Sequence, residues 1–442
     1  MWRASMSGRN GSDLPPDSAI PSIEESSTVK HELPQMVSSI RGATLPDGHI
    51  VDIDVVRDGD RAVVASVRTA DLSDVDVGSP DVIDLRGYLL MTAPAEPHAH
   101  LDKALSWDVL QPPLGDLHDA IAHWKAGSAG FDQESFRTRA RAAALALVRN
   151  GTTAVRSHVD ILPGDDPLRG IRAVDEVRRE LRGVIEIEIA ALAKEYATDD
   201  LVHAALDAGA DLVGGSPHSA PDPMADLHRL LDIAELRGVG VDLHTDEFLE
   251  GDHHTIAAFA GRVSDWPADR IRTAGHCTRL GTMGADELGE LLPLIASSGI
   301  GVVANPITNL YLQGRNHPVA TPRGLTAIGP LRAAGVCVAA GADNVRDPFN
   351  PLGRSDALET AALTVAAAHV HPEVALAMVT DDARRVMGLP VAGARVGARA
   401  EFLAVRGTGV LDVMATAPAD RVVIHDGRVV SISETRNWTA LH

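Results

Sequence analysis

The chain is poor in cysteine and in aromatic residues, and both shortages exclude kinds of protein. Its 442 residues contain two cysteines, Cys277 and Cys337, which are too few for a disulfide framework or for a cysteine-rich zinc site. We therefore expect a reducing, cytoplasmic compartment. Aromatic residues make up only 3% of the chain, so the core must be built from Ala, Val, Leu and Ile.

Long apolar runs and an excess of positive charge are missing as well. No apolar run reaches the roughly 18–20 residues that span a bilayer, and residues 1–35 lack the apolar centre of a signal peptide. The 40 Lys and Arg residues are outnumbered by 61 Asp and Glu residues, which gives a net charge of −21. Because such an acidic surface repels nucleic acids and anionic membranes, we expect neither as a partner.

Short apolar runs alternate with helix-length amphipathic segments through the middle of the chain. Eight of these runs have the length of a strand, at 89–100, 152–160, 183–192, 210–218, 238–247, 270–277, 299–306 and 335–344. Repeated strand–helix units indicate a parallel sheet. Eight units in a chain of this length predict an α/β fold of the TIM-barrel type, a (β/α)8 barrel.

Both ends of the chain are rich in strand-like runs, between residues 37 and 90 and again after residue 400. Asp426-Gly427 between two apolar runs predicts a β-hairpin. Because the termini of a domain tend to lie close together, we expect one composite β domain at 36–91 plus 392–442 and the barrel at 92–391. Residues 1–35 are expected to form a flexible tail or, alternatively, an arm that packs on a partner subunit.

Polar residues stand at the carboxyl ends of these runs, where a TIM barrel has its active site. Five runs end at or beside histidine, at the positions His98 with His100, His158, His218, His244 and His276. The other three end in Lys194-Glu195, in Asn305 and in Asp343-Asn344. Such a convergent set predicts a chemical site.

Three neutral imidazoles and one carboxylate in this set suit zinc or iron with an open position for water. These candidate ligands are His98, His100, His244 and Asp343. A bound metal lowers the pKa of its water toward neutrality. Glu247 is placed to carry a proton to a leaving group, and His276 to orient the attacking oxygen or to stabilise developing charge.

Other polar residues near these positions have ordinary explanations as well. His158 and His218 are each compatible with a satisfied core histidine, and Cys277 is expected to be a packed thiol. Two roles stay open for the charged residues Asp102, Lys103 and Asp160: support of the site, or a salt bridge within a loop.

Six motifs carry a family resemblance. In order they are "EPHAHLDKAL", "RSHVD", "LHTDE", "AGHCT", "ANPITNLYLQGR" and "GADNVRDPFNPLG". Across residues 90–405 they resemble the cytosine deaminase-like group of the amidohydrolase superfamily. The resemblance implies a distorted barrel with a small composite β-sandwich domain. It also implies one divalent metal ion and hydrolytic removal of an amine from a nitrogen heterocycle.

Residue by residue, the resemblance implies that the metal ligands are His98, His100, His244 and Asp343. It also implies a catalytic role for Asp343. It implies that Glu247 is the proton shuttle, that His276 contacts the metal-bound water and that Phe349 is an aromatic wall of the pocket. Zinc, iron and manganese all suit such a ligand set.

Two positions depart from the family pattern. Lys194, in "ALAKEYA", replaces a glutamine that reads the pyrimidine edge, and Asn344 replaces an aspartate. The Asp343-Asn344 pair followed by "VRD" is similar to triazine aminohydrolases of the N-isopropylammelide isopropylaminohydrolase type. Lysine offers only donors and a charge, so we expect a substrate with an oxo-rich or acidic edge rather than cytosine itself. The predicted substrate contacts are Lys194, Asn344, Phe349 and His158.

The sequence thus predicts a hydrolase that removes ammonia or an amine from a pyrimidine- or triazine-like small molecule. One alternative is hydrolysis of a cyclic amide or another non-peptide C–N bond at the same metal site. Another is a barrel that only binds a ligand or a metal. A second metal bridged by a carboxylated Lys194 and assembly into a homo-oligomer also stay open.

Overall fold

The structure is a computed structural model that describes residues 36–71, 79–251, 253–436 and 438–439. The tail predicted at 1–35 lies outside the described residues. None of the helices in the described ranges combines the length and the apolar character needed to cross a bilayer.

Eight parallel strands form the barrel that the alternating pattern predicted. They are β6 (Ala95–Ala99), β7 (Ala154–Asp160), β8 (Glu186–Ala193), β9 (Leu212–Gly215), β10 (Val241–Thr245), β11 (Arg272–His276), β12 (Gly301–Ala304) and β13 (Val338–Ala340). Each strand pairs with the next in chain order, and a parallel bridge between Ala99 and Asp343 joins the last strand to the first. Nearly every strand residue is buried, because helices cover the outside and side chains fill the interior.

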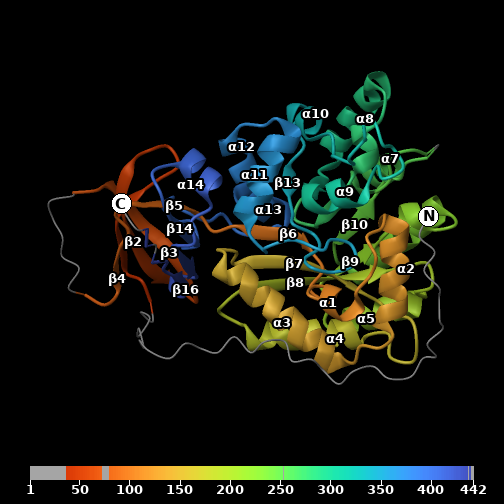
Figure 1. Ribbon diagram of the computed structural model, residues 1–442, viewed down its shortest axis with the longest axis horizontal. Coiled ribbons are helices and arrows are strands. Elements are labelled where there is room, and N and C mark those ends of the chain that lie inside the picture. The colour runs from red at the N-terminus through yellow and green to blue at the C-terminus, as the bar shows by residue number, and fades with distance from the viewer. Residues whose placement is uncertain (1–35, 72–78, 252, 437, 440–442) are drawn as a thin grey trace, which may run out of the picture. The chain divides into compact units, whose positions relative to one another are not determined.

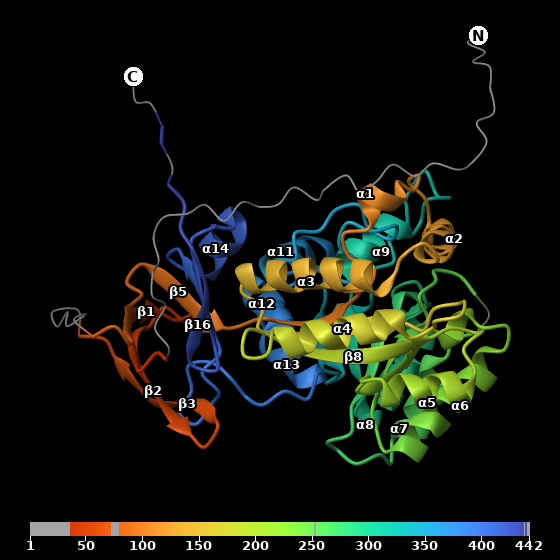
Figure 2. The same ribbon diagram turned by 90° about the horizontal axis from the view of Figure 1, so that it is seen from below.

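Helices follow the barrel strands and surround them (Figures 1 and 2). The helices up to β11 are α1 (Trp107–Leu110), α2 (Leu117–Ser128), α3 (Gln133–Arg149), α4 (Arg169–Glu180), α5 (Asp199–Asp207), α6 (Pro223–Arg237) and α7 (Ile256–Val263). Those after β11 are α8 (Ala285–Ser298), α9 (Pro306–Leu312), α10 (Ile328–Ala333), α11 (Ala357–Ala368), α12 (Pro372–Val379), α13 (Asp381–Val386) and α14 (Val410–Thr416). Two 3₁₀ turns, η1 (Pro217–Ser219) and η2 (Thr278–Gly281), follow β9 and β11.

Local sequence explains where these helices begin and end. Asp222 precedes α6 and its side chain accepts a hydrogen bond from the Ala225 amide at 3.0 Å, while Pro223 occupies the first turn. Gly238 ends α6 with a φ of 67°, a conformation that glycine adopts without strain. The same kind of aspartate cap starts α3, where the Asp132 side chain accepts from the Ser135 amide.

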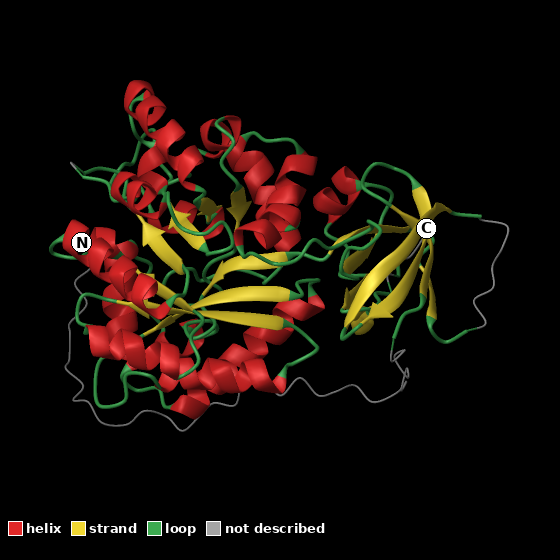
Figure 3. Ribbon diagram, turned by 180° about the vertical axis from the view of Figure 1, so that it is seen from behind, coloured by secondary structure: helices red, strands yellow, loops and turns green. Residues whose placement is uncertain are grey.

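A second sheet is built from both ends of the described chain, as the red and blue strands of Figure 1 show; the same strands are yellow at the right of Figure 3. Its order is β16 (Arg428–Ser433), β15 (Arg421–His425), β14 (Phe402–Arg406), β5 (Tyr88–Thr92), β1 (Ser39–Thr44), β2 (Ile50–Asp58) and β3 (Arg61–Thr69), with β4 (Val82–Asp84) paired to β1. The antiparallel pair β5–β14 joins the two ends. This sheet has its own hydrophobic core, which includes Ile40, Ile53 and Phe402. The predicted fold class is therefore confirmed.

The predicted hairpin lies between β15 and β16. Asp426 and Gly427 connect the strands with φ values of 47° and 71°. Two consecutive residues in the left-handed region match the tight turn that Asp-Gly favours, because its twist suits the flanking strands.

A buried ion pair links this sheet to a barrel helix. Arg421, the first residue of β15, donates from Nη1 and Nη2 to the two carboxylate oxygens of Asp356 at 2.9 and 2.8 Å. Asp356 also caps α11 by accepting from the Leu358 amide at 3.0 Å. The exposed fractions of the two side chains are only 4% and 6%, so neither charge has water to replace its partner.

We expect Asp356→Asn to lower the free energy of unfolding by about 3–5 kcal/mol, because Arg421 then stays buried without a carboxylate. Asparagine caps helices about as well as aspartate, so the helix cap is preserved. Urea unfolding measures the loss. The matched control is Asp222→Asn, an exposed cap without an arginine partner, which should change stability by less than about 0.5 kcal/mol. Equal losses in the two variants would contradict this assignment.

Candidate active site

The carboxyl ends of the barrel strands bring the predicted metal ligands together. His98 lies in β6 with His100 just after it, His244 lies in β10, and Asp343 follows β13. His100 Nε2 lies 3.2 Å from Asp343 Oδ1 and 3.3 Å from His244 Nε2. The ring centroids of His98 and His244 are 4.6 Å apart. Four side chains from distant parts of the sequence thus meet at one point.

The polar atoms of this group fit a metal ion. All four side chains are buried, and both ring nitrogens of His98 and both oxygens of Asp343 lack a hydrogen-bond partner among the described residues. A buried polar group left unpaired costs roughly 1–3 kcal/mol, which a shared cation would offset. Burial lowers the pKa of His98, His100 and His244 well below its usual value. The rings are therefore neutral and offer lone pairs to a metal.

A second cluster of similar residues lies beside His98 and already has a cation. Asp242 accepts a hydrogen bond from Arg156 Nη1 at 2.8 Å, and its other oxygen lies 3.4 Å from His158 Nε2. Because the Arg156 guanidinium neutralises Asp242, this cluster has less need of a metal. His158 was predicted to bind the substrate. The structure instead buries it fully, 4.1 Å from the His98 ring between centroids and outside the lining of the cavity described below.

Glu247 and His276 form a hydrogen-bonded unit with Asn309. Asn309 Nδ2 donates to Glu247 Oε1 at 3.0 Å, and His276 Nδ1 lies 3.2 Å from both Asn309 Oδ1 and Glu247 Oε1. His276 Nδ1 thus faces two acceptors and carries the ring proton, which leaves Nε2 as an acceptor. Burial raises the pKa of Glu247 to about 7, so this carboxyl can exchange a proton near neutral pH. Sequence reasoning missed Asn309, although it lies in the "ANPITNLYLQGR" motif.

Four residues of the same region have a strained backbone. His276 and Asp343 have φ values of 66° and 62°, and Asp246 and Cys277 have values of 48° and 49°. The left-handed conformation costs a residue other than glycine about 1–3 kcal/mol and is common at functional sites. Packing in the surrounding barrel holds these residues in place.

Lys103, Asp102 and Asp160 belong to a buried network beside His100. Lys103 Nζ lies 2.9 Å from Asp160 Oδ1 and 3.0 Å from His100 Nδ1. Asp160 also accepts from Trp124 Nε1 at 2.7 Å, and Asp102 accepts from the Asp160 amide at 3.0 Å. Of the two interpretations left open by the sequence, the geometry therefore favours support of the site over an exposed loop salt bridge.

A cavity of about 570 Å³, within the usual size of a small-molecule site, is lined by His100, His244, Glu247, His276 and Asp343. Lys194, Asn344 and Phe349, three predicted substrate contacts, line it. Lys194 Nζ donates to Ser216 Oγ at 3.2 Å, and burial lowers the lysine pKa. Asn344 Nδ2 donates to Asp347 Oδ2 at 2.7 Å, which leaves its amide oxygen available.

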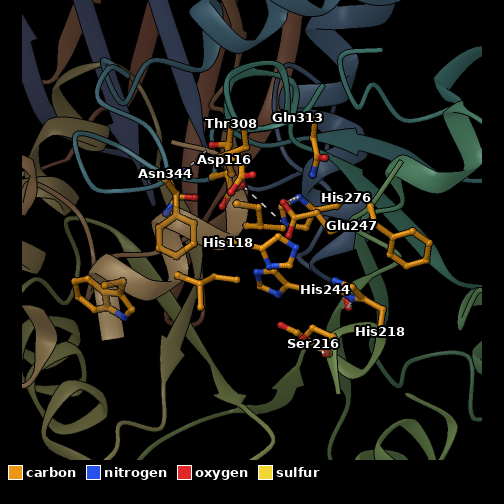
Figure 4. Close-up of a pocket in the computed structure, with 18 of the residues that line it drawn as sticks. Asp116, His118, Ser216, His218, His244, Glu247, His276, Thr308, Gln313 and Asn344 are labelled. Atoms are coloured by element: carbon orange, nitrogen blue, oxygen red, sulfur yellow. Dashed lines mark hydrogen bonds and ion pairs between the residues drawn. The ribbon is translucent and has the colours of Figure 1, made fainter. Parts of the chain in front are cut away.

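Aromatic side chains that the sequence analysis did not single out also line the cavity. They are Trp124, Tyr196 and Phe248. In a chain with only 3% aromatic residues, each aromatic residue near a polar strand end was a usable signal. Figure 4 shows His244, Glu247 and His276 near the centre of the cavity view, with Ser216 and His218 below them and Thr308 and Gln313 above.

Two further residues from the strand ends have ordinary surroundings. His218 Nδ1 lies 3.0 Å from the carbonyl oxygen of His244, and burial lowers its pKa to about 3, so the ring is neutral. Cys277 is fully buried near the carbonyls of β11, and burial raises the pKa of its thiol well above the usual value. This agrees with a packed thiol rather than a nucleophile.

Comparison of sequences relates the chain to known enzymes. The model of the amidohydrolase family matches residues 128–431. Pterin deaminase from Rhizobium rhizogenes (strain K84) is 31% identical over 362 residues, a match that covers 79% of this chain and 82% of that protein. These matches agree with the resemblance seen in the six sequence motifs.

Comparison of structures extends the similarity to nearly the whole chain. The 5-methylcytosine deaminase from Klebsiella pneumoniae, liganded with 5-fluorocytosine, superposes with a TM-score of 0.82 at 26% identity and covers 91% of this chain and 99% of its own. N-isopropylammelide isopropylaminohydrolase from Burkholderia multivorans has a TM-score of 0.76 at 30% identity, with coverage of 89% and 98%.

We expect the purified protein to hold about one equivalent of divalent metal per chain, as a site of three histidines and one carboxylate binds a single ion. The variants His100→Asn and Asp343→Asn should lose most of it, while His228→Asn, at an exposed histidine of α6, keeps it. Elemental analysis after dialysis against zinc or iron measures the content. Two equivalents would contradict a single ion and favour a pair bridged by carboxylated Lys194.

Proposed function

The chain belongs to the amidohydrolase family, and from this premise we propose that it hydrolytically removes ammonia or an amine from a nitrogen heterocycle. Its relatives are deaminases and amidohydrolases, so it is a hydrolase of C–N bonds other than peptide bonds. One observation carries the proposal. A buried group of histidines and one carboxylate, some of whose ligand atoms have no partner among the described residues, lies beside the Glu247 carboxyl, whose pKa burial raises to about 7, at a cavity of small-molecule size.

Four side chains would hold the metal ion in this proposal: His98, His100, His244 and Asp343. When bound, a divalent ion lowers the pKa of a water molecule toward neutrality and supplies the hydrolytic nucleophile. Zinc and iron both suit the ligands, and manganese is a further candidate.

Glu247 handles the protons of the reaction. It takes the proton of the attacking water and delivers it to the departing nitrogen, so that one carboxyl serves both bond formation and bond cleavage. Asn309 donates to Glu247 Oε1 and keeps this carboxylate turned toward His276. His276 has its ring proton at Nδ1, and Nε2 accepts from Asn305 Nδ2 at 3.4 Å. This contact is long, so the Nε2 lone pair can turn from Asn305 to the attacking water, and an unprotonated nitrogen favours orientation of that water over stabilisation of negative charge.

The proposed substrate is a pyrimidine-, triazine- or pterin-like ring with an oxo-rich or acidic edge facing Lys194. The names of three similar enzymes say that they act on pterin, 5-methylcytosine and N-isopropylammelide. Among the described residues Lys194 has no carboxylate partner within salt-bridge distance. A half-buried ammonium without a carboxylate partner favours a ligand that supplies acceptor oxygens. Phe349 and the amide oxygen of Asn344 offer further contacts.

Release of ammonia or amine from a panel of amino- and oxo-substituted pyrimidines, triazines and pterins tests the function. Glu247→Gln should lower kcat by about 10²–10⁴-fold, because no carboxyl remains to move the proton, and should retain the metal. The matched control is Glu290→Gln, at an exposed position on α8, which keeps its rate. An unaltered rate in Glu247→Gln would remove the proton shuttle. Ring opening without ammonia or amine would instead indicate a cyclic amide hydrolase.

Lys194→Gln tests which ring edge is read. In this variant we expect the ratio of kcat/KM for an oxo-rich or acidic ring to kcat/KM for cytosine to fall about 10–100-fold. This fall corresponds to the loss of one hydrogen bond to a charged group. Lys125→Gln, at an exposed lysine on the cavity lining, should keep the wild-type preference. Unchanged preference in Lys194→Gln would show that Lys194 does not choose the substrate.

A further inference from the structure

His218 lines the cavity, yet no step of the proposed reaction uses it. It lies in η1, directly after β9, and its Nδ1 is 3.0 Å from the carbonyl oxygen of His244. A carbonyl oxygen only accepts hydrogen bonds, so Nδ1 must carry the ring proton. The other nitrogen, Nε2, is then an acceptor with a free lone pair. The tautomer of His218 is thus held by the main chain of a proposed metal ligand.

The Nε2 acceptor has no partner in the described part of the chain, where the one recorded hydrogen bond of the His218 side chain is that of Nδ1. The ring of Phe248, 5.9 Å away between centroids, packs beside it and offers no donor. Ser216, just before η1, accepts from Lys194 Nζ at 3.2 Å, and no hydrogen bond between the Ser216 and His218 side chains is found in the described ranges. Figure 4 shows Ser216 and His218 together on the same side of His244.

This side of the cavity therefore presents a donor and an acceptor close together. Lys194 donates through its ammonium, and His218 accepts through Nε2. A ring that carries a carbonyl next to an N–H complements this pair, because its oxygen accepts and its nitrogen donates. A ring with an alkylated nitrogen at that position leaves Nε2 unpaired and adds bulk against it.

We propose that His218 is a specificity-determining residue that accepts a hydrogen bond from a ring N–H beside the carbonyl held by Lys194, so that the enzyme takes heterocycles with a free cyclic amide edge. This inference rests on the proposed function and deepens it. It excludes substrates that are alkylated or glycosylated at that nitrogen. It also places the reading of the ring at the β8–β9 side of the cavity, where Lys194 and His218 follow their strands.

The test compares pterin with 3-methylpterin, which differ only at the ring nitrogen between the reacting carbon and the carbonyl. The wild-type enzyme should favour the N–H member by at least about 100-fold in kcat/KM, because a site built to pair with N–H rejects the analogue that lacks it. In His218→Phe the preference should fall below about 10-fold through loss of rate on the N–H member. His218→Gln, whose amide oxygen accepts, should keep most of the preference.

The matched control is His118→Phe, at another histidine of the cavity lining, which should keep the wild-type ratio. Thermal denaturation checks that each variant folds. Binding of lumazine and 3-methyllumazine to the wild-type protein, measured by calorimetry, reads the same edge without turnover. Release of ammonia from pterin and 3-methylpterin at equal kcat/KM would overturn the role of His218 while leaving the function intact. If no substrate is turned over but lumazine binds better than 3-methyllumazine, the proposed function is overturned and the role of His218 stands. If the two lumazines bind equally, or if neither binds, the inference about His218 is overturned.

Discussion

Three imidazoles and one carboxylate are enclosed at one end of the barrel, where both ring nitrogens of His98 and both oxygens of Asp343 lack hydrogen-bond partners among the described residues. A shared positive charge makes their enclosure favourable. The barrel produces this crowding, because parallel closure sends every strand's carboxyl end to the same face. The Ala99–Asp343 bridge places the last strand beside the first. Asp343 therefore reaches His100, although most of the barrel separates them in the chain.

The charges around this group are neutralised separately. Arg156 donates to Asp242 at 2.8 Å and to Glu188 at 2.6 Å, while Lys103 pairs with Asp160. Removing one member of such a buried pair is strongly destabilising, since the other stays charged without water. These pairs also fix the surroundings of His98 and His100 before any ligand arrives. Preorganised polar groups of this kind need no rearrangement when charge develops in a reaction.

Much of the fold and of the candidate site could be predicted from local pattern. The strand–helix repeat yielded all eight barrel strands, and the Asp426-Gly427 turn yielded the last hairpin. The histidines at the strand ends pointed to one site because a barrel gathers those ends. Depth within the barrel could not be predicted in this way. His158 and Asp160 share one face of β7, yet Asp160 lines the cavity and His158 packs beneath His98, since successive layers of side chains fill a barrel. Asn309 was missed for a related reason, because its role depends on a helix that follows a strand rather than on a strand end.

The sequence by itself determined the alternation of strands and helices and the residue types at the strand ends, because both follow from periodicity along the chain. With them it determined the kind of chemistry that the barrel end is equipped for. Only the tertiary structure decided which of those residues meet, which stay unpaired and which ring nitrogen carries the proton in His218 and His276. Those properties depend on neighbours from other strands. The carbonyl of His244 contacts His218, and the amide of Asn309 joins Glu247 to His276. Both contacts connect different elements of the fold, and the spacing of residues along the chain does not predict them.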